Sequence, residues 1–315
     1  MRMVDVPGLA RPTGRARTVT IANFEHRRAQ AGCRTGYLRL GALIVTIAAA
    51  ASLLPGVADA QTSARPAWEG LLRGQVDGKQ RTAPNKARDA FRKPFEVLQF
   101  LEVKPESAVI EISPGAAGYW TEVLAPYLRD RGLYVAANPA PLSQASKAGI
   151  EKFNAEFAAK MAADAASFGK VKVVNWAPEL PDTLEPGSAD FVLTFRNLHN
   201  WMDRGVVDKA LLSFHRALKK GGILGIKDHR GHPDKPQDPV AQNGYVKQDF
   251  AIAMIERAGF KFAGSSEVVA NPKDTKNYPV GVWALPPTYR MKDQDRAKLA
   301  AIGESDRFLL KFVKP

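Results

Sequence analysis

Short apolar runs alternate with longer helical patterns along most of this chain. Runs rich in Val, Ile and Phe that are too short to be helices are typical of buried strands. They predict strands at Ala108–Ile112, Leu133–Ala137, Val171–Val174, Phe191–Phe195, Ile223–Ile226, Phe260–Ala263 and Arg307–Val313. Apolar side chains at helical spacing predict helices at Asn85–Arg92, Phe95–Leu101, Trp120–Leu128, Leu142–Phe168, Val206–Leu218 and Tyr245–Ala258.

This alternation predicts an α/β fold with a doubly wound, mostly parallel sheet of seven strands. The end of the chain departs from the pattern, because no clear crossover helix separates the last two strands. A long stretch rich in Pro, Asn and Lys, Asn271–Tyr289, lies there instead. A parallel neighbour needs a crossover connection, so the last strand is expected to run antiparallel.

The first sixty residues have a different pattern. Arg34–Arg39 is a short basic segment, Leu40–Leu54 is an almost unbroken apolar run of fifteen, and Ala58-Asp59-Ala60 offers small residues for a signal peptidase. Fifteen apolar residues fall short of the roughly 20 that a membrane-spanning helix needs. We interpret residues 1–60 as a signal peptide with an extended n-region. A periplasmic or secreted protein with no stable membrane span after cleavage is therefore expected, with an uncleaved anchor as the alternative.

The rest of the chain divides into a basic arm with a short helix, residues 61–93, and the α/β domain, residues 94–315. The whole chain has a formal charge of +13, but Lys and Arg are scattered among acidic residues. Nucleic-acid-binding domains cluster their basic residues, so no nucleic-acid partner is expected. The single cysteine, Cys33, lies in the segment predicted to be removed, which excludes a cysteine nucleophile from the mature chain.

A strand, a small-residue turn and a helix follow one another from Val109 to Leu128. In nucleotide-binding folds, the first such turn lets the backbone approach the ligand, and the N–H groups of the helix face it. Gly115 and Gly118 supply the small residues, and Glu111 is a candidate acceptor for hydrogens of the ligand. The spacing Ser113-x-Gly115-x-x-Gly118 also nearly fits a dinucleotide fingerprint, and a close turn without a ligand is a further alternative.

Polar residues follow the fourth and fifth strands, at the sheet edge where open α/β folds bind ligands. Arg196, Asn197 and His199 follow the fourth strand, whereas Asp228 and His229 follow the fifth. Imidazole titrates near neutral pH, so His199 is the candidate general base, with Asp228 and His229 as catalytic candidates beside the substrate. A helix cap or a hydrogen-bonded core histidine is the alternative for His199.

Three further features bear on a ligand site. His229, His232 and Asp234 make a poor metal signal, because no third ligand at a suitable spacing stands out, and no metal site is expected. The stretch Asn271–Pro287 is long for an irregular loop, which is typical of a lid or a binding loop. Trp176, just after the third strand, is a candidate to stack on an adenine ring or to pack under that lid.

Several long strings, in order, resemble an exported bacterial family of class I methyltransferases identified by its fold. They are EISPGAAGYWTEVLAPYL from Glu111, FRNLHNWMD from Phe195, KDHRG from Lys227, NPKDTKNYPVGVWALPP from Asn271 and the closing FLLKFVKP. The resemblance runs from about Arg81 to Pro315. It implies the class I methyltransferase fold and S-adenosylmethionine as methyl donor. The donor would be bound by Glu111, Ser113, Gly115, Gly118, Asn138, Trp176, Arg196 and Asn197.

Two positions depart from the wider methyltransferase pattern. The glycine motif has only one glycine in register, Gly115, and the second strand ends in Asn138 where an acid usually holds the ribose hydroxyls. An asparagine still bonds a hydroxyl, but without the strength that a carboxylate adds.

These features leave three functional interpretations. The first is a methyltransferase acting on an unidentified acceptor, either a small molecule or an envelope component. The second is a non-catalytic exported binding protein on the same scaffold, which the altered motif and the cytoplasmic origin of the donor favour. The third is a nicotinamide-dependent oxidoreductase, against which the missing acid and the reversed last strand count.

Overall fold

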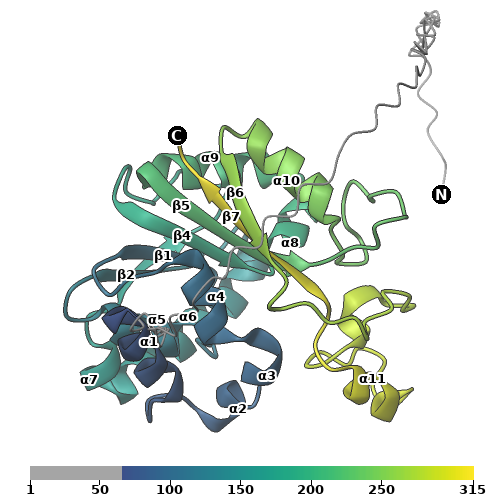
Figure 1. Cartoon of the computed structure of the whole chain (residues 1–315), viewed down its shortest axis with the longest axis horizontal. Coiled ribbons are helices and arrows are strands. Elements are labelled where there is room, and N and C mark those ends of the chain that lie inside the picture. The colour runs from purple at the N-terminus through teal and green to yellow at the C-terminus, as the bar shows by residue number, and fades with distance from the viewer. Residues whose placement is uncertain (1–65) are drawn as a thin grey trace, which may run out of the picture. The chain divides into compact units, whose positions relative to one another are not determined.

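A computed structural model describes residues 66–315. The predicted signal peptide, residues 1–60, lies outside the described residues. Seven strands form a single sheet in the order β3-β2-β1-β4-β5-β7-β6 (Figure 1). The strands are β1 (Ala108–Ile112), β2 (Leu133–Pro139), β3 (Lys172–Trp176), β4 (Ala189–Phe195), β5 (Leu218–His229), β6 (Lys261–Ser266) and β7 (Arg307–Val313). All seven predicted strands are confirmed.

Helices cover both faces of this sheet (Figure 1). The helices before β1 are α1 (Ala67–Asp77), α2 (Ala83–Lys86), α3 (Asp89–Arg92) and α4 (Pro94–Leu101). Later elements are α5 (Thr121–Leu128), α6 (Gln144–Ala163), α7 (Ala165–Phe168), α8 (Leu198–Asp203), α9 (Val207–Ala217), α10 (Gln248–Arg257), the 3₁₀ helix η1 (Gly281–Ala284) and α11 (Arg296–Ile302). The observed order is therefore the alternation of strands and helices that the hydrophobic pattern predicts.

The two faces of the sheet bury separate hydrophobic layers. Phe214 of α9 and Met254 of α10 belong to one layer, and Leu98 of α4 and Phe157 of α6 belong to the other. Neighbouring residues of β1 fall in different layers, since alternate side chains of a strand point to opposite faces. A fully buried Leu such as Leu98 contributes about 1.5–3 kcal/mol relative to an exposed one.

The reversed last strand is confirmed. β7 pairs antiparallel with both β5 and β6, whereas the other pairs are parallel. The connection before β7 differs from the expected irregular stretch, because η1 and α11 form within it. These short helices bury Ala284, Leu285 and Leu299 in a small cluster of their own, so they do not carry the chain across the sheet.

The structure differs from the sequence prediction in one long helix and in the N-terminal arm. The single long helix predicted at Leu142–Phe168 is divided into α6 and α7 at Asp164, whose carboxylate accepts a hydrogen bond from the N–H of Ser167 at 3.0 Å and caps the second helix. The part of the predicted arm that the structure describes, residues 66–93, contains α1, α2 and α3. Leu72 and Val76 of α1 are buried in the same layer as Leu98.

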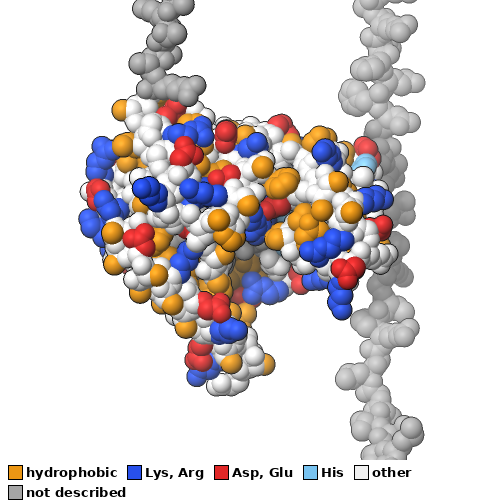
Figure 2. Space-filling view, turned by 90° about the horizontal axis from the view of Figure 1, so that it is seen from below, with side chains coloured by type: hydrophobic (Ala, Val, Ile, Leu, Met, Phe, Trp, Pro, Cys, Tyr) orange, Lys and Arg blue, Asp and Glu red, His pale blue; other side chains and the backbone are white. Residues whose placement is uncertain are grey.

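The surface carries mixed charge. Figure 2 shows basic and acidic side chains interspersed over the face in view, with small apolar areas between them. Within residues 66–315, no helix combines the length and the apolar character that a membrane crossing requires.

Candidate active site

The turn after β1 and the start of α8 lie at the same edge of the sheet. β1 and β4 are parallel neighbours, so both end there. Asn197 joins the two segments, because its Nδ2 donates hydrogen bonds to the carbonyl of Ile112 at 3.1 Å and to Oγ1 of Thr194 at 3.0 Å. The turn and the segment that carries His199 therefore share one edge of the sheet, although His199 and Ser113 line different cavities.

The turn after β1 has an uncommon backbone. Ser113, Gly115 and Gly118 have φ of 52°, 79° and 56°, in the left-handed region that favours glycine. A Cβ at Gly118 would lie 3.3 Å from Lys160 Cε, whereas at Gly115 it would meet nothing within 4 Å. The space beside Gly115 is therefore open.

A cavity of about 150 Å³ lies next to this turn, at the ends of β2 and β3. It is lined by Ser113, Pro139, Ala140, Leu142, Ser146, Ile150, Trp176, Ala177, Pro178, Trp201 and Arg204. We call it the donor-side cavity. Trp176 is buried and its Nε1 donates to Oγ of Ser213 at 3.0 Å, so its edge is fixed while its ring adjoins the cavity.

Two of the residues assigned to the donor are engaged elsewhere. Glu111 is buried and accepts a hydrogen bond from the Tyr134 hydroxyl at 2.6 Å. Burial raises the pKa of Glu111 to about 8, although Tyr134 and the cations Arg92 and Lys227 oppose the rise. Asn138 Nδ2 donates to Asn154 Oδ1 at 3.0 Å. Neither Glu111 nor Asn138 is among the residues that line the donor-side cavity.

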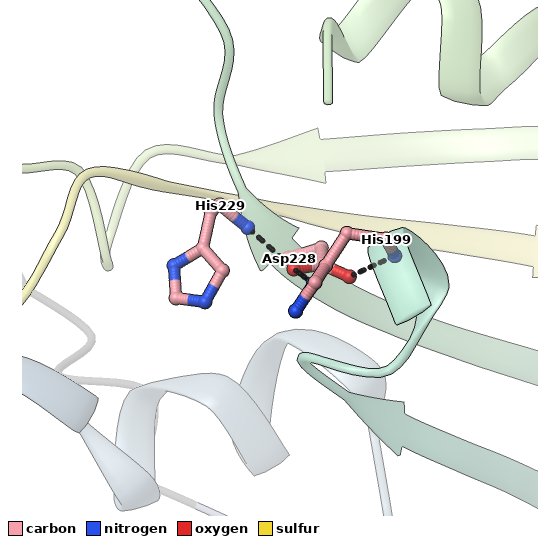
Figure 3. Close-up of side chains that lie close together, drawn as sticks. All are labelled: His199, Asp228 and His229. Carbon is pink, nitrogen blue, oxygen red and sulfur yellow. Dashed lines mark hydrogen bonds and ion pairs between the residues drawn. The ribbon is translucent and has the colours of Figure 1, made fainter. Parts of the chain in front are cut away.

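His199, Asp228 and His229 come together where β5 ends beside α8 (Figure 3). Asp228 accepts from His199 Nδ1 at 2.8 Å, from the His199 backbone N–H at 3.1 Å and from the His229 backbone N–H at 2.7 Å. With Nδ1 donating to the carboxylate, Nε2 of His199 carries a free lone pair. The carboxylate thus holds the ring in the tautomer that a general base requires.

His229 has a different environment from His199. Its Nδ1 lies 2.5 Å from Oγ of Ser305, and its ring centroid is 5.1 Å from that of His199. Burial, followed by His199, Arg307 and Arg196, holds the pKa of His229 well below its usual range. His229 therefore stays neutral, which suits a hydrogen-bonding role beside the base.

The three side chains also have the spacing of metal ligands, which the sequence pattern did not predict. One potential ligand atom from each lies within 4.8 Å of the others. However, Asp228 already accepts three hydrogen bonds, and Arg196 and Arg307 line the same cavity as the two histidines. These positive surroundings disfavour the binding of a metal cation.

A second cavity, of about 190 Å³, opens beside these histidines, and we call it the acceptor-side cavity. It is lined by Arg196, His199, Asn200, His229, Val282, Trp283, Pro286, Pro287, Thr288, Ser305 and Arg307. Val282, Trp283 and the two prolines belong to the stretch that the sequence predicts as a lid. The Trp283 ring lies edge-on to His199, with 6.1 Å between centroids, so the lid does cover the candidate base.

A buried group of arginines behind this cavity was not predicted. Glu304 accepts hydrogen bonds from Arg88 at 2.6 Å, from Arg92 at 3.4 Å and from Arg307 at 2.5 Å. Burial alone would raise the pKa of Glu304, but Arg307, Arg92 and Arg88 outweigh it and hold the pKa far below the usual range. No local motif identifies this group, because Arg88 and Arg92 lie more than two hundred residues before Glu304 in the sequence.

Comparisons with known proteins agree with this architecture. No family model matches the chain, and no curated protein sequence is similar to it. Among solved structures, the [4+2]-cyclase SpnF is similar at a TM-score of 0.50 and 15% identity, over 78% of this chain and 91% of that one. A SAM dependent methyltransferase from Aquifex aeolicus has a TM-score of 0.49 and 16% identity, over 77% and 98% of the two chains.

These likenesses concern the fold alone, and one of the two proteins is a cyclase, so the chemistry has to be argued from the site. The seven-stranded sheet, with β7 antiparallel between β5 and β6, decides the architecture. The chain has the class I methyltransferase fold.

Proposed function

We propose that this protein is a methyltransferase that uses S-adenosylmethionine and employs His199 as general base. The observation that carries the proposal is the pairing of His199 with Asp228 at the end of β5, on the same edge of the sheet as the turn after β1. A base held by a carboxylate, between an open turn and a covered cavity, is the arrangement that removal of a proton during transfer requires.

The donor supplies an electrophilic methyl group on sulfur. An oxygen or nitrogen of the acceptor forms the new bond to the methyl carbon, and the carbon–sulfur bond breaks with its electrons remaining on sulfur. The proton of the acceptor passes to Nε2 of His199. Asp228 stabilises the resulting imidazolium, and the lid with Trp283 excludes water from the transfer.

The donor-side residues fit an adenosine ligand in two respects. The ring of Trp176 adjoins the cavity, and Oδ1 of Asn138 is buried and accepts no hydrogen bond from residues 66–315. Asn138 does not line the cavity, so a ribose hydroxyl reaches that oxygen only if the cavity widens at the end of β2. The cavity is smaller than the roughly 300 Å³ of most small-molecule pockets, so binding requires the segment from Pro139 to Ile150 to move outward.

Calorimetry with S-adenosylmethionine tests the proposal, with NAD as the comparison ligand. We expect binding of S-adenosylmethionine and no binding of NAD. The reverse order of affinities would indicate an oxidoreductase. Absence of binding by either ligand would contradict the methyltransferase proposal and leave a scaffold that binds another molecule.

We also propose that the protein is exported. The support is the basic, apolar and small-residue order of residues 34–60. Sequencing the N-terminus of protein from fractionated cells should identify Gln61 or a neighbour outside the cytoplasm. An intact residue 40–60 segment on cytoplasmic protein would contradict export.

A further inference from the structure

The charges around the acceptor-side cavity do not balance. Arg88, Arg92 and Arg307 share one carboxylate, that of Glu304. Arg196 lies close enough to be repelled by Arg92 and Arg307, and it is attracted by Glu304 and Asp228 without pairing directly with either. Asp228, the other nearby carboxylate, is already occupied by His199 and the N–H of His229.

Several nitrogen atoms of these arginines have no partner. Nε of Arg307 and Nη2 of Arg88 and Arg92 are buried without a hydrogen-bond acceptor in the described part of the chain. Arg196, which lines the cavity, has neither an ion pair nor a side-chain hydrogen bond within residues 66–315. Its φ of 67° is also uncommon for a residue with a side chain.

Such an arrangement is costly in the absence of a ligand. Arg196 is partly exposed, but no carboxylate within residues 66–315 pairs with it directly, so the distant charges of Glu304 and Asp228 only partly replace the hydration that it loses. Burial, and then repulsion by Arg307, lowers the pKa of Arg196 to about 10. An unpaired cation that lines a cavity despite this energetic cost is typical of a site that binds an anion.

We propose that the acceptor-side cavity binds the anionic group, a carboxylate or a phosphate, of a small methyl acceptor. This inference rests on the proposed function. Arg196 and Arg307 face the anion, since guanidinium groups bind planar and tetrahedral oxyanions through paired hydrogen bonds. A hydroxyl or amine elsewhere on the same molecule then reaches Nε2 of His199.

The remaining walls of the cavity limit what the ligand is. Trp283, Pro286 and Pro287 add apolar surface to the lining of this cavity. A volume of about 190 Å³ holds a molecule of a few heavy atoms beyond its anionic group. The cavity therefore fits a compact organic acid or phosphate ester rather than a polymer.

Calorimetric titration of the mature protein with inorganic phosphate and, separately, with acetate distinguishes the two anions. We expect one of them to bind at low ionic strength. Arg196→Gln should weaken that binding by about 10-fold or more, and Arg196→Lys, which keeps the charge but not the paired donors, by less. Arg216→Gln is the matched control, because Arg216 is half-exposed on α9 and pairs with Asp182.

Thermal unfolding provides a second measurement, and its expected result differs from that of a purely structural role of Arg196. Without ligand, Arg196→Gln should raise the melting temperature, because it removes an unpaired cation, whereas the control should leave it nearly unchanged. Saturating anion should raise the melting temperature of the wild type more than that of the variant.

Two results would overturn the inference. One is that neither anion binds the wild type, and the other is that Arg216→Gln weakens binding as much as Arg196→Gln. Binding of S-adenosylmethionine is measured on the same proteins. If the protein binds the donor but neither anion, only the proposed class of acceptor is contradicted. If it binds an anion through Arg196 but does not bind the donor, only the methyltransferase proposal is contradicted.

Discussion

The donor-side and acceptor-side cavities share one edge of the sheet but differ in how many of their polar groups are hydrogen-bonded within the protein. On the donor side, Glu111 bonds to Tyr134 and Trp176 bonds to Ser213. On the acceptor side, Arg196 and Arg307 retain unpaired donors at the cavity or directly behind it. Polar groups that are hydrogen-bonded within the protein stabilise the fold, whereas unpaired polar groups beside a cavity are available to bind a ligand. Asn138 Oδ1 is the exception on the donor side, since it is buried without a hydrogen-bond partner in residues 66–315.

The largest effect is expected at the candidate base. His199→Ala should lower turnover by roughly 10² to 10⁴, because proton transfer contributes on that scale. Donor affinity should change little, since His199 lines only the acceptor-side cavity. Methyl transfer and donor binding are measured separately on the same variant.

His215→Ala is the matched control. His215 lies on α9 and packs against Phe260, away from both cavities. Loss of donor binding in His199→Ala would make His199 a structural residue of the pocket and remove the contrast between the two sides.

The next effect concerns stability on the acceptor side. Glu304→Gln should lower the free energy of unfolding by about 3–5 kcal/mol at neutral pH, because the buried Arg92 and Arg307 and the partly exposed Arg88 lose the carboxylate that they share. Glu102→Gln, which breaks an exposed pair with Lys311, should cost no more than about 1 kcal/mol. Chemical denaturation measures both, and equal costs would argue against a tightly coupled cluster.

The same carboxylate predicts a pH dependence. The folded-state pKa of Glu304 is depressed, so its contribution is fully present above the unfolded-state pKa of about 4.3. It is lost as the pH falls below that value toward the folded-state pKa. The wild type should therefore lose stability on acidification more steeply than Glu304→Gln.

On the donor side, a smaller effect is expected from the turn. Gly115→Val should reduce donor affinity by about 10-fold or more, because its side chain enters the open space beside the turn. The fold should survive with a strain of about 1–2 kcal/mol at a φ of 79°. Gly187→Val is the control, since Gly187 has a φ of 61° and equally open surroundings, but precedes β4 at the opposite edge of the sheet. Unchanged donor binding in a folded Gly115→Val protein would place the donor elsewhere.

The smallest effect on donor binding is expected at Glu111. Its pKa is raised to about 8, so the folded protein holds a proton that the unfolded chain releases near pH 4.3. Stability from this group therefore declines as the pH rises between these two values. Glu111→Gln should flatten that slope and leave donor affinity nearly unchanged. A large loss of donor affinity would instead return Glu111 to the binding site that the sequence pattern suggested.

Much of the fold could be predicted from the sequence because hydrophobic periodicity is a local property. The apolar runs specify the seven strands, and the lack of a long crossover before Arg307 specifies the reversed one. The positions of His199 and Asp228 also followed, since the carboxyl ends of parallel strands share one edge. The stretch around Trp283 covers this edge as its length suggested.

Other features were decided only by tertiary structure. Glu111 bonds to Tyr134 of β2, a contact that depends on how the two strands pair. Asn138 likewise bonds to Asn154, which lies on α6. The arginines around Glu304 look like ordinary surface residues in the sequence. Packing buries them together, and burial turns scattered charges into an unbalanced site, because the energy of a charge depends on the neighbours and the solvent that the fold assigns to it.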